Sequence, residues 1–180
     1  MEQIRPFRPA DYGAEVAEIL ALDGDGGRPL TLAMKAGFAE ARERLKSASA
    51  SRLFAGARVP EAAFSGLYVY FSCFDEAHQI AQDIPTAEGS YWHAIVHRME
   101  PDAGNAAYWF RQVGTHPIFP ALARAAGREG KWDPFAFIDL CEQARHQPGS
   151  ELESRARAVQ LVEWQLLFDW CAKSASVTSS

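Results

Sequence analysis

The sequence is poor in cysteine and has no long apolar run, and each absence excludes a class of protein. Its 180 residues include three cysteines, Cys73, Cys141 and Cys171, which lie far apart and form no CxxC pair. We therefore expect buried, reduced thiols rather than a disulfide framework. No stretch approaches the ~18 consecutive apolar residues that a membrane span needs, so no membrane association is predicted.

The chain also has no large excess of charge of either sign. The formal net charge is −5, the sequence pI is near 5.5, and no run of five like charges occurs. A mildly acidic chain with scattered basic residues is not expected to bind nucleic acid, which usually requires a basic face. The first residues, Met1 to Pro6, lack the apolar core of a signal peptide, so we expect a cytoplasmic protein.

Hydrophobic residues make up 48% of the chain and aromatic residues 12%, which predicts a substantial core. The length fits one domain, which we place at residues 1–173, followed by a disordered tail at 174–180. Apolar residues recur at steps of three and four over much of the chain, which is typical of helices. We expect an all-α, single-domain bundle of about six to seven helices, preceded by an irregular N-terminal arm.

Five of the predicted helices matter for the site or for its support. The stripe that contains Phe64, Phe71 and His78 predicts one continuous helix. Thr86 is a candidate N-cap for the next helix. The five helices are expected at about 30–46, 61–83, 87–99, 105–113 and 151–173.

The region between residues 75 and 117 is the densest in chemically reactive side chains. In a helix, His93, His97 and Glu100 have the spacing i, i+4 and i+7, which directs two imidazoles and a carboxylate toward one point. Such ligands suit zinc or iron, and the preceding helix could add His78. The HExxH motif of zinc proteases is absent, because Ala94 follows the first of these histidines.

A second group of side chains in this region is typical of a pocket for an anionic small molecule. Arginine offers a planar fork for carboxylate or phosphate, and aromatic rings supply an apolar wall. If the pocket is catalytic, His78, His93 or His97 would act as general base. The residues predicted to bind the ligand are Asp75, Glu76, Arg98, Asn105, Trp109, Arg111 and His116.

Glu163 lies on the apolar stripe of the last predicted helix, where a lone carboxylate is costly. It therefore needs a histidine or arginine partner from the 75–117 region, or else it extends outward between loosely packed helices.

The dense region also resembles a family of small, uncharacterised helical proteins. The resemblance covers residues 64–122, about a third of the chain, and implies no activity, because none is known for that family. It rests on Phe74-Asp-Glu-Ala-His78, Ser90-Tyr-Trp-His-Ala-Ile-Val-His-Arg98, Asn105-x-x-Tyr-Trp-Phe-Arg111 and Gly114-x-His-Pro117.

Three hypotheses about function remain open at this stage. The first is a helical domain that binds a small anionic molecule, with or without catalysis by histidine. The second is a metal-dependent helical enzyme that uses zinc or iron on His93, His97 and a carboxylate such as Glu100. The third is a non-catalytic interaction module whose exposed aromatic residues form a homodimer.

Overall fold

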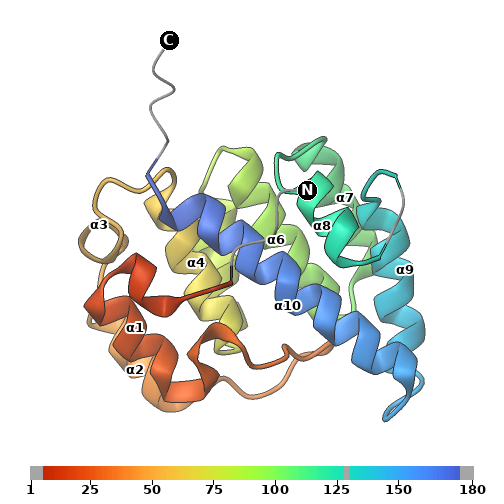
Figure 1. Cartoon of the computed structure of the whole chain (residues 1–180), viewed down its shortest axis with the longest axis horizontal. Coiled ribbons are helices and arrows are strands. Elements are labelled where there is room, and N and C mark those ends of the chain that lie inside the picture. Colours follow the sequence, from red (N-terminus) through yellow and green to blue (C-terminus); the bar gives the residue numbers. More distant parts are fainter. Residues whose placement is uncertain (1–5, 128–129, 175–180) are drawn as a thin grey trace.

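The computed structural model describes residues 6–127 and 130–174, and this part of the chain is built from helices (Figure 1). Helices account for 68% of the described residues, which form no β-strand. The predicted all-α class is therefore confirmed. The tail predicted at 174–180 lies outside the described residues, apart from Ser174.

Ten α-helices occur in the described residues, nine of them with at least seven residues, so the predicted number of six to seven is wrong. Two short 3₁₀ helices flank α1, at Pro9–Tyr12 and Ala21–Gly26, and the first of them lies in the predicted irregular arm. In chain order the α-helices are α1 (Ala14–Leu20), α2 (Ala39–Lys46), α3 (Ala50–Leu53), α4 (Pro60–Tyr70), α5 (Phe74–Gln82), α6 (Ala87–Met99), α7 (Ala103–Val113), α8 (Phe119–Ala125), α9 (Pro134–Arg145) and α10 (Glu151–Ala172).

The helix predicted over 61–83 is in fact two helices, α4 and α5. The chain breaks at Ser72, which has a positive φ of 58°, a left-handed conformation that a helix interior does not tolerate. The amide of Cys73 closes the turn by donating to the carbonyl oxygen of Tyr68 at 2.9 Å. Because of this break, α5 packs against α4 instead of extending it.

The helix predicted over 30–46 forms only in its second half, as α2. In the first half, side chains of α9 and α10 donate hydrogen bonds to the backbone carbonyl oxygens. Arg145 donates to the carbonyl oxygen of Leu32 at 2.8 Å. Gln160 donates to that of Thr31 at 2.6 Å. Local helix propensity is weak compared with such tertiary contacts, so the segment stays a loop.

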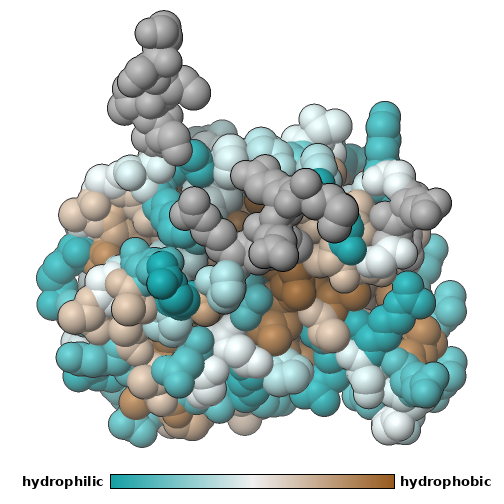
Figure 2. All heavy atoms as spheres, viewed as in Figure 1, coloured by the Kyte–Doolittle hydropathy of each residue, from teal (hydrophilic) through white to brown (hydrophobic). Residues whose placement is uncertain are grey.

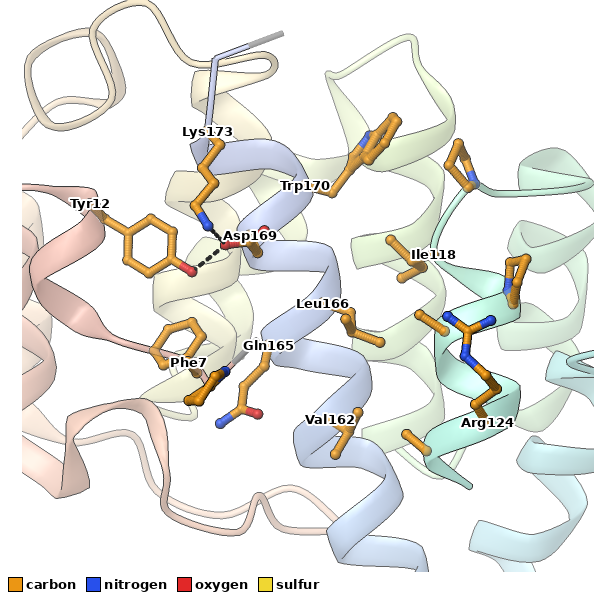
Figure 3. Close-up of a pocket in the computed structure, with 15 residues that line it drawn as sticks. Phe7, Tyr12, Ile118, Arg124, Val162, Gln165, Leu166, Asp169, Trp170 and Lys173 are labelled. Carbon is orange, nitrogen blue, oxygen red and sulfur yellow. Dashed lines mark hydrogen bonds and ion pairs between the residues drawn. The ribbon is translucent and has the colours of Figure 1, made fainter. Parts of the chain in front are cut away.

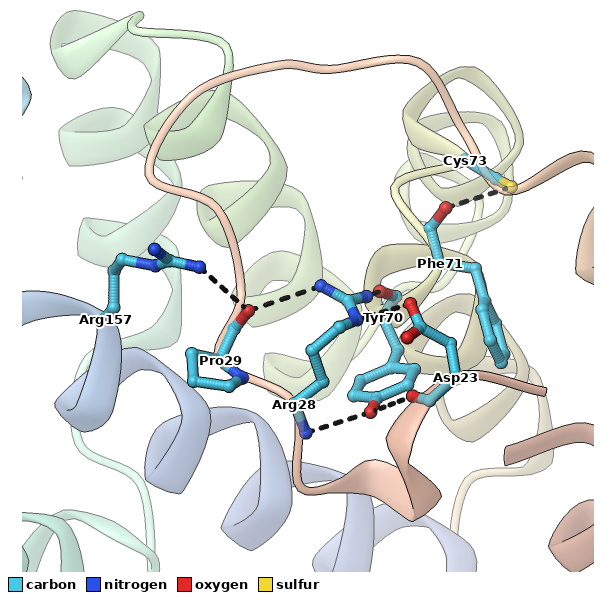
Figure 4. A network of polar contacts seen from close by, with 7 residues as sticks. All are labelled: Asp23, Arg28, Pro29, Tyr70, Phe71, Cys73 and Arg157. Atoms are coloured by element: carbon cyan, nitrogen blue, oxygen red, sulfur yellow. Dashed lines mark hydrogen bonds and ion pairs between the residues drawn. The ribbon is translucent and has the colours of Figure 1, made fainter. Parts of the chain in front are cut away.

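A polar network ties the loop after α1 to the end of α4 (Figure 4). The guanidinium of Arg28 donates to the backbone oxygen of Tyr70 at 2.6 Å and lies 2.5 Å from the carboxylate of Asp23. The Tyr70 hydroxyl in turn donates to the backbone oxygen of Asp23 at 2.6 Å. These bonds satisfy polar groups of the 3₁₀ helix Ala21–Gly26, of Arg28 just after it, and of the end of α4.

The core is organised around α10, the longest helix, which crosses the front of the molecule in Figure 1 and packs against α4, α8 and α9. Trp164 of α10 is fully buried and donates its indole N–H to the carbonyl oxygen of Gly66 on α4 at 2.8 Å. Gly66 has no Cβ, and one added there would lie 2.7 Å from the ring of Trp92 on α6. Close aromatic packing thus fixes α4 and α10 relative to α6, which carries most of the candidate site.

None of the described helices combines the length and the apolar character that crossing a bilayer requires.

Candidate metal centre

Three histidines from two helices lie together where α5 packs on α6. His78 belongs to α5, whereas His93 and His97 occupy successive turns of α6. The prediction that Thr86 caps this second helix is confirmed, because its side chain accepts a hydrogen bond from the amide of Gly89 at 3.4 Å. The packing of α5 on α6 therefore adds a third imidazole to the pair that helical spacing alone brings together.

The three imidazoles form a compact cluster. The Nε2 atoms of His78 and His93 are 2.8 Å apart, and one ring nitrogen from each histidine lies within 4.8 Å of those of the other two. The rings of His93 and His97 stack with centroids 4.8 Å apart, and the ring of His78 stands nearly perpendicular to both. Two nitrogens on one tetrahedral zinc ion are about 3.3 Å apart, so the pair at 2.8 Å would have to separate, and any pair near 4.8 Å to approach, for all three to bind one ion.

Two further groups surround the cluster. The ring of Trp109, on α7, stacks on that of His93 with centroids 4.1 Å apart. A carboxylate oxygen of Glu100 lies 3.1 Å from Nδ1 of His97, and one of Asp102 lies 4.0 Å from the same atom. The predicted ligand Glu100 is therefore placed beside His97 rather than among the three clustered nitrogens.

Burial keeps two of the imidazoles neutral. Desolvation, together with the nearby rings of His78 and His97, lowers the pKa of His93 to about 4. Desolvation also lowers the pKa of His97, although the carboxylate of Glu100 opposes this shift. Neutral imidazole is the form that coordinates metals.

The cluster lies at the edge of the core rather than deep within it. His93 is 3% exposed and the side chain of His97 12%, while His78 is half-buried. The Nδ1 atom of His93 is buried without a hydrogen-bond partner in the described residues, which is unfavourable for a purely structural histidine. Three imidazoles arranged in this way are chemically suited to hold a transition-metal ion.

The chain matches no protein family, no curated protein and no solved structure. The similarity of residues 64–122 to a family of small helical proteins stays a prediction, and the site is interpreted from its own geometry.

Arg98, predicted to bind an anionic ligand, lies in the core with a carboxylate of the protein itself. Both Arg98 and Glu163 of α10 are fully buried and form an ion pair. The hydroxyl of Tyr91 donates to the same carboxylate at 3.0 Å, and Arg98 also donates to the side-chain oxygen of Gln160 at 3.2 Å. Of the two alternatives left open for Glu163, the structure shows the first, a basic partner from the 75–117 region.

His116 lies in a second buried environment, apart from the three clustered histidines. Its Nε2 is 3.7 Å from a carboxylate oxygen of Glu88, which also accepts a hydrogen bond from the indole of Trp170 at 2.9 Å. The contact with His116 is the largest of the effects that lower the pKa of Glu88 to about 2.

The remaining predicted ligand residues have other partners or face solvent. Glu76 is 2.9 Å from the guanidinium of Arg42. The side-chain amide of Asn105 donates to the carboxylate of Asp102 at 2.7 Å. Asp75 and Arg111 are exposed. Of the predicted site, the structure thus brings together His78, His93, His97, Glu100 and Trp109.

A groove lies elsewhere in the described residues, between α10, α8 and the segment before α1 (Figure 3). It has a volume of about 760 Å³, and hydrophobic residues gather beside α10 on this face of the molecule (Figure 2). Its walls include Phe7, Ile118, Leu166 and Trp170. None of the site residues predicted from sequence lines it, because the groove depends on contacts between segments far apart in the chain.

Proposed function

We propose that this chain is a transition-metal protein in which His78, His93 and His97 hold one divalent ion, zinc or iron. The observation that carries the proposal is the convergence of three imidazole nitrogens from two helices within 4.8 Å. Imidazole suits zinc, iron, copper and nickel, and three imidazoles form the protein ligand set of some catalytic zinc sites.

The surroundings of the cluster support the same proposal. Histidines that bind metals usually donate their second ring nitrogen to a carboxylate, which orients the ring and raises its basicity. Glu100 is placed to do this for His97, at 3.1 Å from Nδ1. Glu100, predicted as a metal ligand, would then contact the ligand His97 rather than the metal. His78 would take its place as the third ligand.

The hypothesis of an anion-binding pocket has less support in this region. Glu163 already occupies the guanidinium of Arg98, and Arg111 points to solvent. Because the guanidinium groups of Arg98 and Arg111 do not converge, they do not form a site for a carboxylate or phosphate. The homodimer hypothesis stays a prediction.

The experiment is elemental analysis of untagged protein purified without chelator, together with the separate variants His78→Ala, His93→Ala and His97→Ala. The exposed His146 lies outside the cluster, so His146→Ala is the matched control. We expect near-stoichiometric metal in the wild type and the control and a loss of metal in each cluster variant, with unchanged circular dichroism.

A variant outside the cluster adds a graded test. Glu100→Ala should weaken zinc affinity by roughly 10–100-fold without abolishing binding, as removal of a carboxylate behind a ligand does. A wild-type protein that neither carries metal nor binds added Zn²⁺ or Co²⁺ would refute the proposal.

A further inference from the structure

We infer that a metal held by His78, His93 and His97 keeps one coordination position open to solvent and activates water there for attack on a carbonyl ester. This inference rests on the proposed function, and it goes further because a metal site can also be closed and purely structural.

The number of protein ligands is the first argument. Within residues 6–127 and 130–174, the histidine, cysteine and carboxylate atoms that meet at this point come from only three residues. Structural zinc sites use four protein ligands, whereas catalytic sites use three and leave the fourth position to water or substrate. The oxygen of Glu100 does not fill that position, because it lies against Nδ1 of His97.

The position of the cluster is the second argument. On one side, Trp109 covers the ring of His93, which is 3% exposed. On the other side, His78 is half-buried and the side chain of His97 is 12% exposed. A metal bound here would thus have a closed apolar wall and an open side, which gives a substrate a direction of approach.

The charge of the ligands is the third argument. Three neutral imidazoles leave the double positive charge of the ion uncompensated, so its effect on a bound water is strong. Three-histidine zinc lowers the pKa of bound water from about 15.7 to about 7 in carbonic anhydrase, the general precedent for such a site. Hydroxide is then available near neutral pH without a separate general base.

The reaction balances without any further reagent. The bound water releases a proton to solvent, and the remaining hydroxide oxygen forms a bond to the carbonyl carbon of the ester. The bond from that carbon to the alkoxide oxygen breaks, and the alkoxide takes up a proton from solvent. The acid leaves and another water binds, so that one ester and one water give one acid and one alcohol.

The test uses the full chain loaded with Co²⁺, whose visible absorption reports coordination, and azide as a probe for an open position. We expect the spectrum to change saturably with azide, and we expect hydrolysis of 4-nitrophenyl acetate that is lost in His93→Ala and retained in His146→Ala. The rate should rise with pH to a plateau, following ionisation of the bound water.

The outcomes separate the inference from the proposed function. Stoichiometric Co²⁺ with a spectrum indifferent to azide would overturn the inference and leave a structural metal site. Azide binding with no ester hydrolysis above the His93→Ala background would overturn the activation of water. Failure to bind Co²⁺ or Zn²⁺ at all would overturn the proposed function, and the inference with it.

Discussion

The buried ion pair between Arg98 and Glu163 allows a quantitative test of how α6 is anchored to α10. Both side chains are fully buried, so neither charge can be solvated by water if its partner is removed. Breaking such a pair from one side usually costs about 3–5 kcal/mol, because an uncompensated charge stays in the core. We therefore expect Arg98→Met and Glu163→Leu each to lower the free energy of unfolding by roughly that amount.

The double variant Arg98→Met/Glu163→Leu should cost far less than the sum of the two single changes. It removes both charges and leaves only the hydroxyl of Tyr91 and the side-chain oxygen of Gln160 without their present partners. Each such orphaned group costs about 1–3 kcal/mol, which the added apolar surface partly offsets. At central values the two single changes sum to about 8 kcal/mol and the double variant costs about 4 kcal/mol before this offset, so the coupling energy should be about 4 kcal/mol.

Urea denaturation followed by circular dichroism measures all four proteins, with thermal unfolding as a second probe. In a chain of this length, a loss of 3–5 kcal/mol should lower the Tm by roughly 6–20 °C. Additive effects of Arg98→Met and Glu163→Leu would refute the reasoning, as would a single variant that costs less than about 1 kcal/mol.

Two further predictions concern α6 and its neighbours. Glu88 has a folded pKa of about 2 against an ordinary 4.5, so its stabilising contribution is complete above pH 4.5 and is lost as the pH falls toward 2. Glu88→Gln should therefore flatten the acid limb of the stability curve by at most about 3 kcal/mol, measured by urea denaturation from pH 6 to pH 2.5, and an unchanged limb would exclude the contact with His116. Gly66→Ala should destabilise by about 1–3 kcal/mol because the methyl group meets the buried ring of Trp92, whereas Gly104→Ala, with its nearest atom at 3.7 Å, should be neutral or slightly stabilising in thermal unfolding.

The fold was predictable wherever local signals agree with tertiary packing. Helix α6 begins after the predicted cap Thr86 and covers 87–99 as expected. The division of the 61–83 segment into α4 and α5 was not predictable from the sequence. The apolar stripe continues past Ser72, although the backbone there adopts a left-handed conformation. Periodicity reports which residues are buried and not whether the backbone between them is continuous.

The candidate site was predictable in its position and in part of its composition. Helical spacing correctly placed His93 and His97 on neighbouring turns, and the apolar stripe of the preceding helix placed His78 inward. It was not predictable that the carboxylate of Glu100 lies against Nδ1 of His97 rather than among the three clustered nitrogens, because Glu100 lies in the turn that ends α6. Nor does the sequence reveal that Arg98 finds its partner in Glu163, 65 residues away.

The reactive side chains of residues 75–117 therefore form one dense segment in the sequence but lie in several separate environments in the structure. Consecutive residues of an α-helix point about 100° apart, so His97 and Arg98 project to different sides of α6. One side meets α5 and gathers imidazoles at the edge of the core, and the other meets α10 and buries an ion pair. A buried pair of this kind is often no more stabilising than apolar residues of the same size. What it adds here is a fixed rotation of α6 about its own axis, because Glu163 accepts hydrogen bonds from both Arg98 and Tyr91. That rotation determines where His97, the residue before Arg98, is directed, and so whether its imidazole faces those of His78 and His93.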